Sequence, residues 1–447
     1  MKILLTVHQF LPEYAAGTEV LTCSVACELI ARGHEVHVLT AFPSQQQASD
    51  EQRFDEYDHD GIHVYRFHHA YTPMAGQTSM IEIGYDNRLA GAYFKKIVAA
   101  FKPDLVHFFH LNRLGTSLIE LAAQAGVPAY LTPTDFWTIC PTAQLVLCNG
   151  RLCAGPSFHA GNCIKHFAER TQKGLISKLA KWTPTPLAGA LARLTKAGLL
   201  PRYPHDGEVK AISGRLSTNI GRLNQLRKII APNRFMAELL LRHGVLPSRI
   251  AQSSYGIDLP AEQFARIRRS SGQALRVGFI GTLAHYKGCH VLIESFKTLP
   301  TGRATLKIYG NTQAFPGYAS DLQQKAGNHP FIEFCGVFLN SKISQVMAEL
   351  DVLVVPSLWY ENTPLVVYSA QAAGCLVLAS NFPGISEVVQ DEVNGLLFEA
   401  GHSEALAARL VRLCNEQGLL ERLLARVDRP KSTVTYVDEL LDFWMTA

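Results

Sequence analysis

Residues suited to binding a phosphate group cluster in the second half of the 447-residue sequence. The run Phe279-Ile280-Gly281 has the pattern of a strand that ends in a loop, and Lys287 follows shortly before an expected helix at Cys289–Phe296. Glycine lets a backbone approach a ligand closely, and a lysine near a helix N-terminus favours an anion. The alternative is a lysine that is simply solvated in its loop.

A second cluster joins an expected buried strand at 352–355 to an expected helix that begins at Leu365. Glu361 follows the carboxyl end of this strand, the edge at which open α/β sheets bind their ligands. The backbone N–H groups of Leu365 and Val366, at the start of the helix, are suited to hydrogen-bonding a diphosphate. The alternative for Glu361 is a helix N-cap or a surface carboxylate.

The elements that must position these residues follow a regular pattern. Short apolar runs alternate with longer helical patterns, which is typical of βαβ units around parallel sheets. The expected strands are 3–7, 35–39, 105–108, 129–131, 276–280, 305–309, 331–334, 352–355 and 376–379, and the expected helices include 19–32, 115–125 and 437–443. We predict an α/β protein with two Rossmann-like, doubly wound domains that face each other across a cleft.

The predicted domains are residues 1–255 and 256–426, and they meet near residues 255–272. The segment 427–447 is expected to carry a helix that returns to the first domain. Between about residues 140 and 228 the βαβ pattern is lost, so we interpret this Cys-rich, basic stretch as an insertion in the first domain.

The composition predicts a folded cytoplasmic enzyme. Apolar residues make up 47% of the chain and charged residues 18%, which excludes general disorder. A formal net charge of +4 is too small for a dedicated nucleic-acid binder. No window approaches the roughly 20 apolar residues that span a bilayer. Ten cysteines without an export signal point to a reducing compartment.

The predicted insertion carries a group of possible metal ligands. Zinc accepts three cysteines and one histidine, and the group contains Cys140, Cys148, Cys153, Cys163 and His166. The alternatives are buried small hydrophobic residues or a redox-labile pair. Because the spacing is irregular, we predict no metal site.

The run Lys173–Trp182 mixes basic and apolar residues at helical spacing. Such a helix can lie in an anionic membrane interface, with Trp182 at the depth of the headgroups. The alternative is a solvated helix packed on its domain. A peripheral contact with the inner face of the cell membrane is therefore one of the expectations.

Together these motifs resemble those of family 4 glycosyltransferases, which are retaining enzymes of the two-Rossmann GT-B architecture. The resemblance covers most of the chain, in the order of the family. It is carried by Pro12…Ala16-Gly17-Thr18-Glu19 with Arg32-Gly33-His34-Glu35-Val36, Pro103-Asp104-Leu105-Val106-His107-Phe108-Phe109-His110, Gly281…Lys287-Gly288, and Pro356-Ser357…Glu361…Pro364-Leu365-Val366 followed by Ala372-Ala373-Gly374, Pro383-Gly384-Ile385…Glu387 and Asn394-Gly395-Leu396.

The resemblance implies transfer of a sugar from a nucleotide-diphospho-sugar, UDP- or GDP-linked, with retention and without a metal ion or other cofactor. It implies that the second domain binds the donor and that a glycan or lipid-linked acceptor enters from the first domain. Cell-surface polysaccharide or lipopolysaccharide synthesis is the expected setting. The implied catalytic residues are His110 beside the transferred sugar, Glu361 at the donor sugar and Lys287 at the phosphates. The implied donor-binding residues are Gly17, Gly281, Thr282, Lys287, Glu361, Leu365, Val366 and Ser369.

Two of these positions depart from the family pattern. Ser369 stands where the family has a second glutamate that binds the ribose, and a serine cannot be a bidentate charged acceptor. Thr282 stands where a basic residue is common. Two other functions therefore stay open: a GT-B nucleotide-sugar epimerase, and a non-catalytic partner protein with a degenerate donor site.

Overall fold

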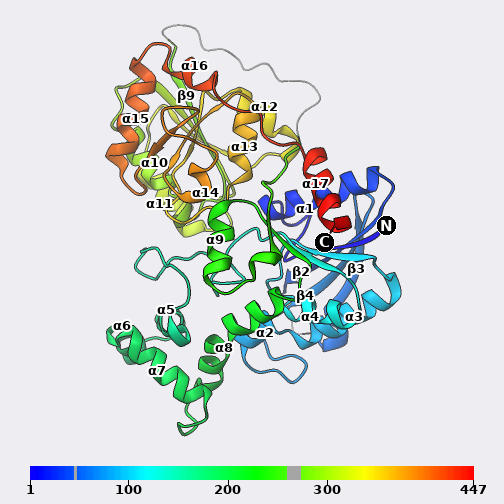
Figure 1. Ribbon diagram of the computed structural model, residues 1–447. Coiled ribbons are helices and arrows are strands. Elements are labelled where there is room, and N and C mark those ends of the chain that lie inside the picture. Colours follow the sequence, from blue (N-terminus) through cyan, green and yellow to red (C-terminus); the bar gives the residue numbers. More distant parts are fainter. Residues whose placement is uncertain (45–47, 259–272, 447) are drawn as a thin grey trace. The chain divides into compact units, whose positions relative to one another are not determined.

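The computed structural model describes residues 1–44, 48–258 and 273–446 (Figure 1). The chain divides into a first unit, Met1–Ser254 with Tyr436–Ala447, and a second unit, Tyr255–Thr435. Of the junction expected at 255–272, residues 259–272 lie outside the described residues.

An eight-stranded sheet forms the centre of the first unit. Only β3 and β4 pair antiparallel, and the remaining pairs are parallel. In spatial order the strands are β3 (Phe54–His59), β4 (Ile62–His69), β2 (Glu35–Pro43), β1 (Lys2–Val7), β5 (Leu105–Phe108), β6 (Ala129–Leu131), β7 (Lys228–Ala231) and β8 (Ile250–Gln252). The buried apolar side chains of β1 and β5 make these two strands part of the core.

The helices of the first unit connect these strands. The first, α1, ends where Gly33 takes a φ of 83°, a left-handed conformation that glycine adopts without strain. The helices are α1 (Gly17–Ala31), α2 (Met80–Tyr85), α3 (Arg88–Phe101), α4 (Ser117–Gln124), α5 (Gly161–Thr171), α6 (Leu175–Trp182), α7 (Thr185–Lys196), α8 (Asp206–Leu223) and α9 (Arg234–Arg242). The stretch that lacks the βαβ pattern is mainly helical from residue 161 onward, where it contains α5 to α8.

The C-terminal helix α17 (Thr433–Thr446) packs on the first unit. The indole of Trp444 donates to His107 Nδ1 at 3.2 Å, and the hydroxyl of Tyr436 lies 3.2 Å from Thr132 Oγ1. His107 is fully buried on β5, and burial lowers its pKa to about 3. It is a neutral core histidine, as its place on an apolar strand predicts.

The second unit has a six-stranded, fully parallel sheet. In spatial order its strands are β11 (Ile332–Gly336), β10 (Ala304–Tyr309), β9 (Leu275–Ile280), β12 (Val352–Val355), β13 (Leu376–Ser380) and β14 (Leu396–Phe398). Its helices are α10 (Cys289–Phe296), α11 (Pro316–Ala326), α12 (Ile343–Ala348), α13 (Leu365–Ala372), α14 (Pro383–Ser386), α15 (Ser403–Asn415) and α16 (Leu419–Leu424).

Both faces of this second sheet are covered. Along β12, Val352 and Val354 join one apolar cluster, whereas Leu353 and Val355 join another, because successive side chains of a strand point to opposite faces. Helices α10, α11 and α15 contribute to the first cluster and α13 to the second. The predicted α/β class with two parallel-sheet units is confirmed.

Candidate active site

The loop after β9 packs backbone to backbone on the segment that follows β12. Gly288 has a φ of 69°, and a Cβ atom added to it would lie 1.8 Å from the carbonyl oxygen of Pro356. Leu358 donates its backbone N–H to the carbonyl of Tyr286 at 2.8 Å. Only glycine permits this approach, which brings the neighbouring Lys287 to the segment that carries Glu361.

The Glu361 carboxylate is the centre of a buried polar cluster in the second unit. Its Oε1 atom lies 2.7 Å from Lys287 Nζ. The same oxygen accepts hydrogen bonds from Ser357 Oγ at 2.5 Å and from the Trp359 indole at 2.8 Å. The Glu361 side chain is only 5% exposed. The alternative of a helix cap or a surface carboxylate is therefore wrong, because the residue is buried and Pro364 is the N-cap of α13.

Lys287 is held between this carboxylate and an aromatic ring. Its Nζ lies 5.0 Å from the centroid of the Trp359 ring, within the range of a cation–π contact. Tyr286 packs on the same ring, with centroids 4.8 Å apart, and burial together with Glu361 raises its pKa. The Lys287 side chain keeps 23% of its surface exposed, so it is less buried than the Glu361 side chain.

The segment before α13 is fixed by its own contacts. Thr363 has a φ of 55°, which is uncommon for a residue other than glycine, and its hydroxyl donates to the carbonyl of Gly384 at 2.6 Å. A Cβ atom at Gly384 would lie 1.9 Å from the carbonyl oxygen of Glu361. This glycine thus serves the packing of the loop that carries the carboxylate.

Helix α13 begins at Leu365, as predicted. Leu365 and Val366 are its first two residues, and such residues have no hydrogen-bond partner for their N–H groups within the helix. Ser369 donates its hydroxyl to the carbonyl of Leu365 at 3.1 Å, so the donor function of this hydroxyl is used inside the helix. Thr282 is half-buried, and its carbonyl accepts from the N–H of Ala284 at 2.9 Å.

Gly281 lies directly after β9, and its N–H donates to the carbonyl of Tyr309 at 3.1 Å. A Cβ atom there would make only ordinary contacts, the nearest at 3.7 Å from the ring of Phe279. Packing within the second unit therefore does not require glycine at this position, in contrast to Gly288.

In the first unit, His110 follows β5 and Asp135 follows β6, two neighbouring parallel strands. His110 Nε2 lies 2.9 Å from Asp135 Oδ2, and His110 Nδ1 accepts the backbone N–H of Asn112 at 3.0 Å. Because Nδ1 accepts, the proton of the neutral ring is on Nε2, and Nε2 donates to Asp135. Both ring nitrogens of His110 are thus engaged within the unit. Gly17 is the exposed first residue of α1.

Helix α8 holds the segment that follows Asp135. Asn219 donates to the carbonyl of Thr138 at 2.8 Å, and the fully buried guanidinium of Arg215 donates to the carbonyls of Trp137 and Ile139. Trp137 in turn donates its backbone N–H to Asp135 at 2.7 Å.

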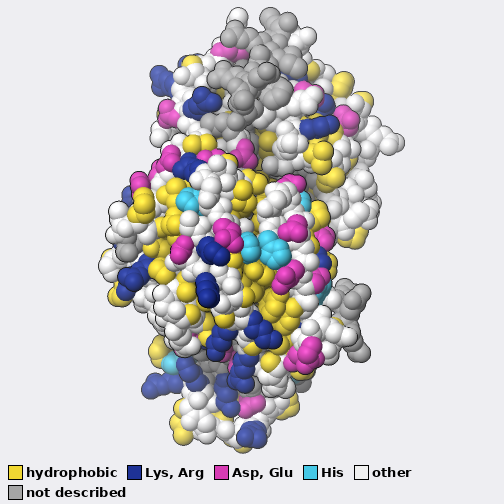
Figure 2. Space-filling model, turned by 90° about the vertical axis from the view of Figure 1, so that its right-hand side faces the viewer, with side chains coloured by type: hydrophobic (Ala, Val, Ile, Leu, Met, Phe, Trp, Pro, Cys, Tyr) yellow, Lys and Arg dark blue, Asp and Glu magenta, His cyan; other side chains and the backbone are white. Residues whose placement is uncertain are grey.

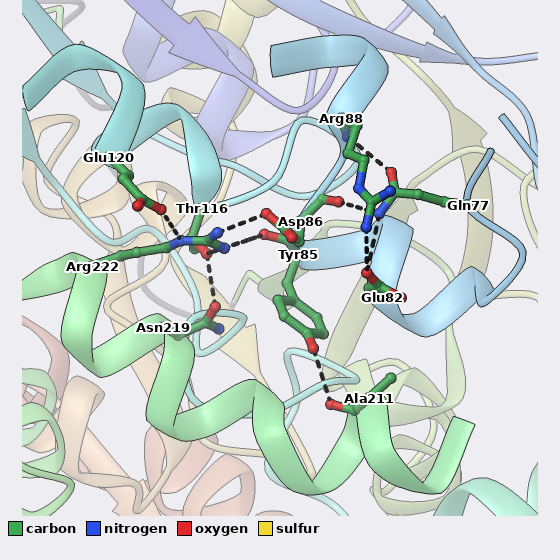
Figure 3. Close-up of polar contacts among 10 residues, drawn as sticks. All are labelled: Gln77, Glu82, Tyr85, Asp86, Arg88, Thr116, Glu120, Ala211, Asn219 and Arg222. Atoms are coloured by element: carbon green, nitrogen blue, oxygen red, sulfur yellow. Dashed lines mark hydrogen bonds and ion pairs between the residues drawn. The ribbon is translucent and has the colours of Figure 1, made fainter. Parts of the chain in front are cut away.

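The same helix is tied to α4 and to the C-terminal end of α2 by the network of Figure 3. Arg222 contacts Asp86 at 2.6 Å and Glu120 at 3.3 Å, while Asn219 accepts the hydroxyl of Thr116 at 2.8 Å. A helix of the inserted stretch is therefore an integral part of the first unit, and the position of Asp135 depends on it.

No disulfide joins any of the ten cysteines, all of which lie in the described ranges. Burial raises the pKa of Cys163 to about 12, and Asn162 donates to Cys153 Sγ at 3.4 Å. In the described ranges, no group of three or more His, Cys, Asp or Glu side chains is placed to hold a metal ion.

The sequence did not indicate the partners of Glu361. Ser357 lies within the quoted motif, but nothing in the sequence shows that its hydroxyl points to the carboxylate. Nor does the sequence show that the Trp359 indole donates a hydrogen bond to Glu361. In the first unit, His8 and Glu19 were not singled out, although they lie next to His110.

Two α/β units with mainly parallel sheets, each with charged or polar groups at the carboxyl ends of its strands, are the architecture of glycosyltransferases of the GT-B class. Two family models match the chain: the glycosyl transferase 4-like domain over residues 16–162 and glycosyl transferases group 1 over residues 274–416. The chain belongs to this group 1, family 4 lineage of retaining glycosyltransferases.

Relatives agree with this assignment. An uncharacterized glycosyltransferase of Methanocaldococcus jannaschii is 29% identical over 38% of this chain and 44% of its own length, so the match spans less than half of that relative. The amylovoran biosynthesis glycosyltransferase AmsK of Erwinia amylovora is 26% identical over 75% of this chain and 85% of its own length. The crystal structure of Anabaena HepE, in complex with UDP and glucose, shares the fold with a TM-score of 0.63 at 16% identity, over the full length of both chains.

Proposed function

We propose that this protein transfers a sugar, with retention of anomeric configuration, from a UDP- or GDP-linked donor to a glycan or lipid-linked acceptor of cell-surface polysaccharide synthesis. The observation that carries the proposal is the cluster at Glu361, in which a buried carboxylate and the partly exposed side chain of Lys287 lie on the loops that lead into α10 and α13. The setting rests on relatives such as the amylovoran enzyme.

The chemistry of transfer assigns a role to each group. As the glycosidic bond of the donor breaks, negative charge develops on the departing diphosphate, and fixed positive charge stabilises it. Lys287 and the N–H groups of Leu365 and Val366 supply that charge without a metal ion. Gly281, Thr282 and Gly17 line the path of the phosphates, and Ser369 offers an oxygen to the ribose. Glu361 contacts the donor sugar, and His110 contacts the transferred sugar from the first unit.

Glycine at position 281 supports the close approach of a phosphate. A Cβ atom would fit there without a clash, so packing within the unit does not require glycine at this position. Close approach of a ligand to the backbone would require it. The inference matches the resemblance, in which this loop lies against the diphosphate.

A thermal-shift panel of UDP, GDP, ADP, CMP and dTDP tests the donor site. A ligand present at about 100 times its Kd adds roughly 2.7 kcal/mol of stability, which is readily measured as a rise in Tm. We expect UDP or GDP to raise the Tm of the wild-type chain and not that of Lys287→Ala. Equal shifts in both chains, or no shift with any nucleotide, would contradict the proposed site and favour a partner protein with a degenerate donor site.

Product analysis separates transfer from epimerisation. A transferase releases one nucleoside diphosphate for each new glycoside, whereas an epimerase changes the sugar without an acceptor. The anomeric configuration of the product, determined by NMR, tests retention.

We also propose a peripheral contact between the run Lys173–Trp182 and an anionic membrane. No helix in the described ranges has the length and apolar composition that a bilayer crossing requires. The residues from Lys165 to Arg202 include eight Lys or Arg and one acidic residue. In α6, Trp182 is 84% exposed. Figure 2 shows Lys and Arg side chains gathered toward the lower end of the molecule, the end at which Figure 1 draws α7.

Helix α7 adds an apolar surface to this region. Leu187, Leu191 and Leu194 are exposed at the spacing of one helical face, while the small residues Ala188, Gly189 and Ala192 are buried. Leucines beside lysines suit an interface in which apolar side chains enter the headgroup layer and basic groups meet anionic lipid.

Vesicle sedimentation tests the contact. We expect binding to vesicles that contain phosphatidylglycerol and little binding to pure phosphatidylcholine. The double change Lys178→Glu and Lys181→Glu should weaken binding at least about 30-fold, since each basic residue near the surface contributes about 1 kcal/mol. Leu339→Ala, at an apolar residue of the second unit that is 69% exposed, is the control and should bind as the wild type. Equal binding to both kinds of vesicle would contradict the proposal.

A further inference from the structure

An arginine without a carboxylate partner lies in the loop that follows β5. Arg113 is half-buried, and within residues 1–44, 48–258 and 273–446 no acidic side chain forms an ion pair with it. Its Nη1 atom donates to the carbonyl of His8 at 3.0 Å and to Gln9 Oε1 at 3.3 Å. Both acceptors are neutral, so they hold the guanidinium in place and leave its charge uncompensated.

The Nη2 atom of Arg113 is open to a ligand. It has no hydrogen-bond partner in the described part of the chain, and it is not buried, whereas Nε of the same guanidinium is buried without a partner. A guanidinium presents its donors in a rigid plane. Because Nη1 is fixed by His8 and Gln9, the direction of the Nη2 donor is fixed as well.

The backbone of Arg113 is held in an uncommon conformation. Its φ is 68°, in the left-handed region that residues other than glycine rarely adopt, and its carbonyl accepts from Asn87 Nδ2 at 3.0 Å. Asn87 itself is fully buried. His8, the partner of the guanidinium, directly follows β1, and His110 lies in the same loop as Arg113. Fixed contacts thus place the guanidinium at the carboxyl edge of the first sheet, where ligands bind in such folds.

The end of β4 adds an exposed aromatic ring to this edge. His69 is buried there, and the nearby Tyr71 is 69% exposed, with its ring centroid 5.1 Å from that of His69. Burial, Arg113 and Arg53 lower the pKa of His69 to about 4, so this ring is neutral near pH 7. Both charges that act on His69 are positive, and such surroundings attract an anion. Tyr71 and Arg113 therefore both lie beside one neutral imidazole.

We propose that Arg113 and Tyr71 bind an acidic acceptor glycan, with Arg113 Nη2 donating to an anionic oxygen of the acceptor and the Tyr71 ring packing against one of its sugars. The proposal rests on the glycosyltransferase function proposed above and names the chemical class of its acceptor. Guanidinium groups form charge-assisted hydrogen bonds with phosphate and carboxylate oxygens, and an aromatic ring offers an apolar surface to the C–H face of a sugar. In a lipid-linked glycan, the anionic oxygen belongs to the diphosphate that joins glycan and lipid or to a uronic acid.

The test is steady-state kinetics with UDP-glucose and GDP-mannose as donors and lipid-linked glycans extracted from bacterial membranes as acceptors. Mild acid removes the lipid diphosphate from one portion of the acceptor, and reduction of activated carboxyl groups converts the uronic acids of a second portion into neutral sugars. On untreated acceptor, Arg113→Gln should raise the acceptor KM about tenfold or more, the effect of losing a charge-assisted hydrogen bond, while the Kd for UDP or GDP stays within twofold. On the portion that has lost the bound anionic group, variant and wild type should differ by less than twofold, and that treatment identifies the group.

Further variants separate the charge, the ring and the fold. Arg113→Lys keeps a positive charge and should recover part of the affinity for untreated acceptor. Tyr71→Ser should raise the acceptor KM several-fold with every portion, and Tyr71→Phe, which keeps the ring, should lose less. Arg242→Gln is the matched control, because Arg242 is an exposed arginine of the first unit at the last position of α9, and its KM should stay within twofold of the wild type. Melting curves confirm that each variant is folded.

The outcomes are distinct. A KM for Arg113→Gln within twofold of the wild type on untreated acceptor would overturn the proposal, and so would an equal rise on all portions, which a purely structural role of Nη1 predicts. A loss of UDP or GDP affinity in Arg113→Gln would also overturn it, because the donor would then be the ligand. If the wild-type chain forms product and these results fail, the proposed function stands. If the wild-type chain forms no product with either donor, the proposed function fails and this inference fails with it.

Discussion

Glu361→Gln and Lys287→Ala are expected to change nucleotide binding in opposite directions. In the present arrangement the Lys287 ammonium lies 2.7 Å from Glu361 Oε1, so a diphosphate must compete with this carboxylate for the same cation. Glutamine removes the competing charge, and we expect UDP or GDP to bind a few-fold more tightly. Alanine at position 287 removes the cation itself, and a charge-assisted hydrogen bond of about 1.5–3 kcal/mol corresponds to a loss of roughly 10- to 150-fold in affinity.

Sugar transfer should fall in both variants. Loss of a fixed charge or a fixed hydrogen-bond partner at the reacting centre typically costs about 10²–10³ in kcat. Isothermal titration with UDP and GDP gives the affinities, and release of nucleoside diphosphate gives the rates. Lys342→Ala and Glu404→Gln remove exposed charges of the same unit and are the controls. If Glu361→Gln weakens nucleotide binding as much as Lys287→Ala does, Glu361 organises the lysine rather than competing for it.

The pattern of strands and helices could be predicted because buried parallel strands are short apolar runs, and Ile3–Val7 and Val352–Val355 are examples. The hairpin of β3 and β4 was missed, and so were the short strands β7, β8 and β14. The sequence of β3, FDEYDH, carries three acidic residues and is at most half-buried, so it lacks the apolar signal of a strand.

The sequence predicted which residues form the candidate site but not how their side chains contact one another. Lys287 and Glu361 follow β9 and β12, which pair in parallel, so their approach follows from the topology. The convergence of Ser357 and Trp359 on one carboxylate oxygen depends on the path of a loop that includes the left-handed Thr363. Likewise, His8 and Glu19 meet because α1 packs beside β1, and no local pattern indicates that contact.

Gly288→Ala is expected to unfold the donor-site loop. The added Cβ would lie 1.8 Å from the carbonyl oxygen of Pro356, where only movement of the backbone relieves the clash. The left-handed φ of 69° adds strain of about 1–2 kcal/mol for a residue with a Cβ atom. We expect a total loss above about 3 kcal/mol and no thermal shift with UDP or GDP, because Lys287 is displaced with its neighbour.

Gly302→Ala separates the effect of left-handed backbone strain from the effect of a steric clash with the backbone. Gly302 lies in the same unit and has a φ of 78°, yet a Cβ atom there would have nothing within 4 Å. Its replacement should cost only the strain of about 1–2 kcal/mol and leave nucleotide binding unchanged. Urea unfolding of the two variants, followed by circular dichroism, measures the difference. Equal losses of stability in the two variants would mean that the Gly288 loop accommodates the added Cβ atom with no further loss of stability. The close contact between Gly288 and Pro356 would then not explain why Lys287 lies beside Glu361.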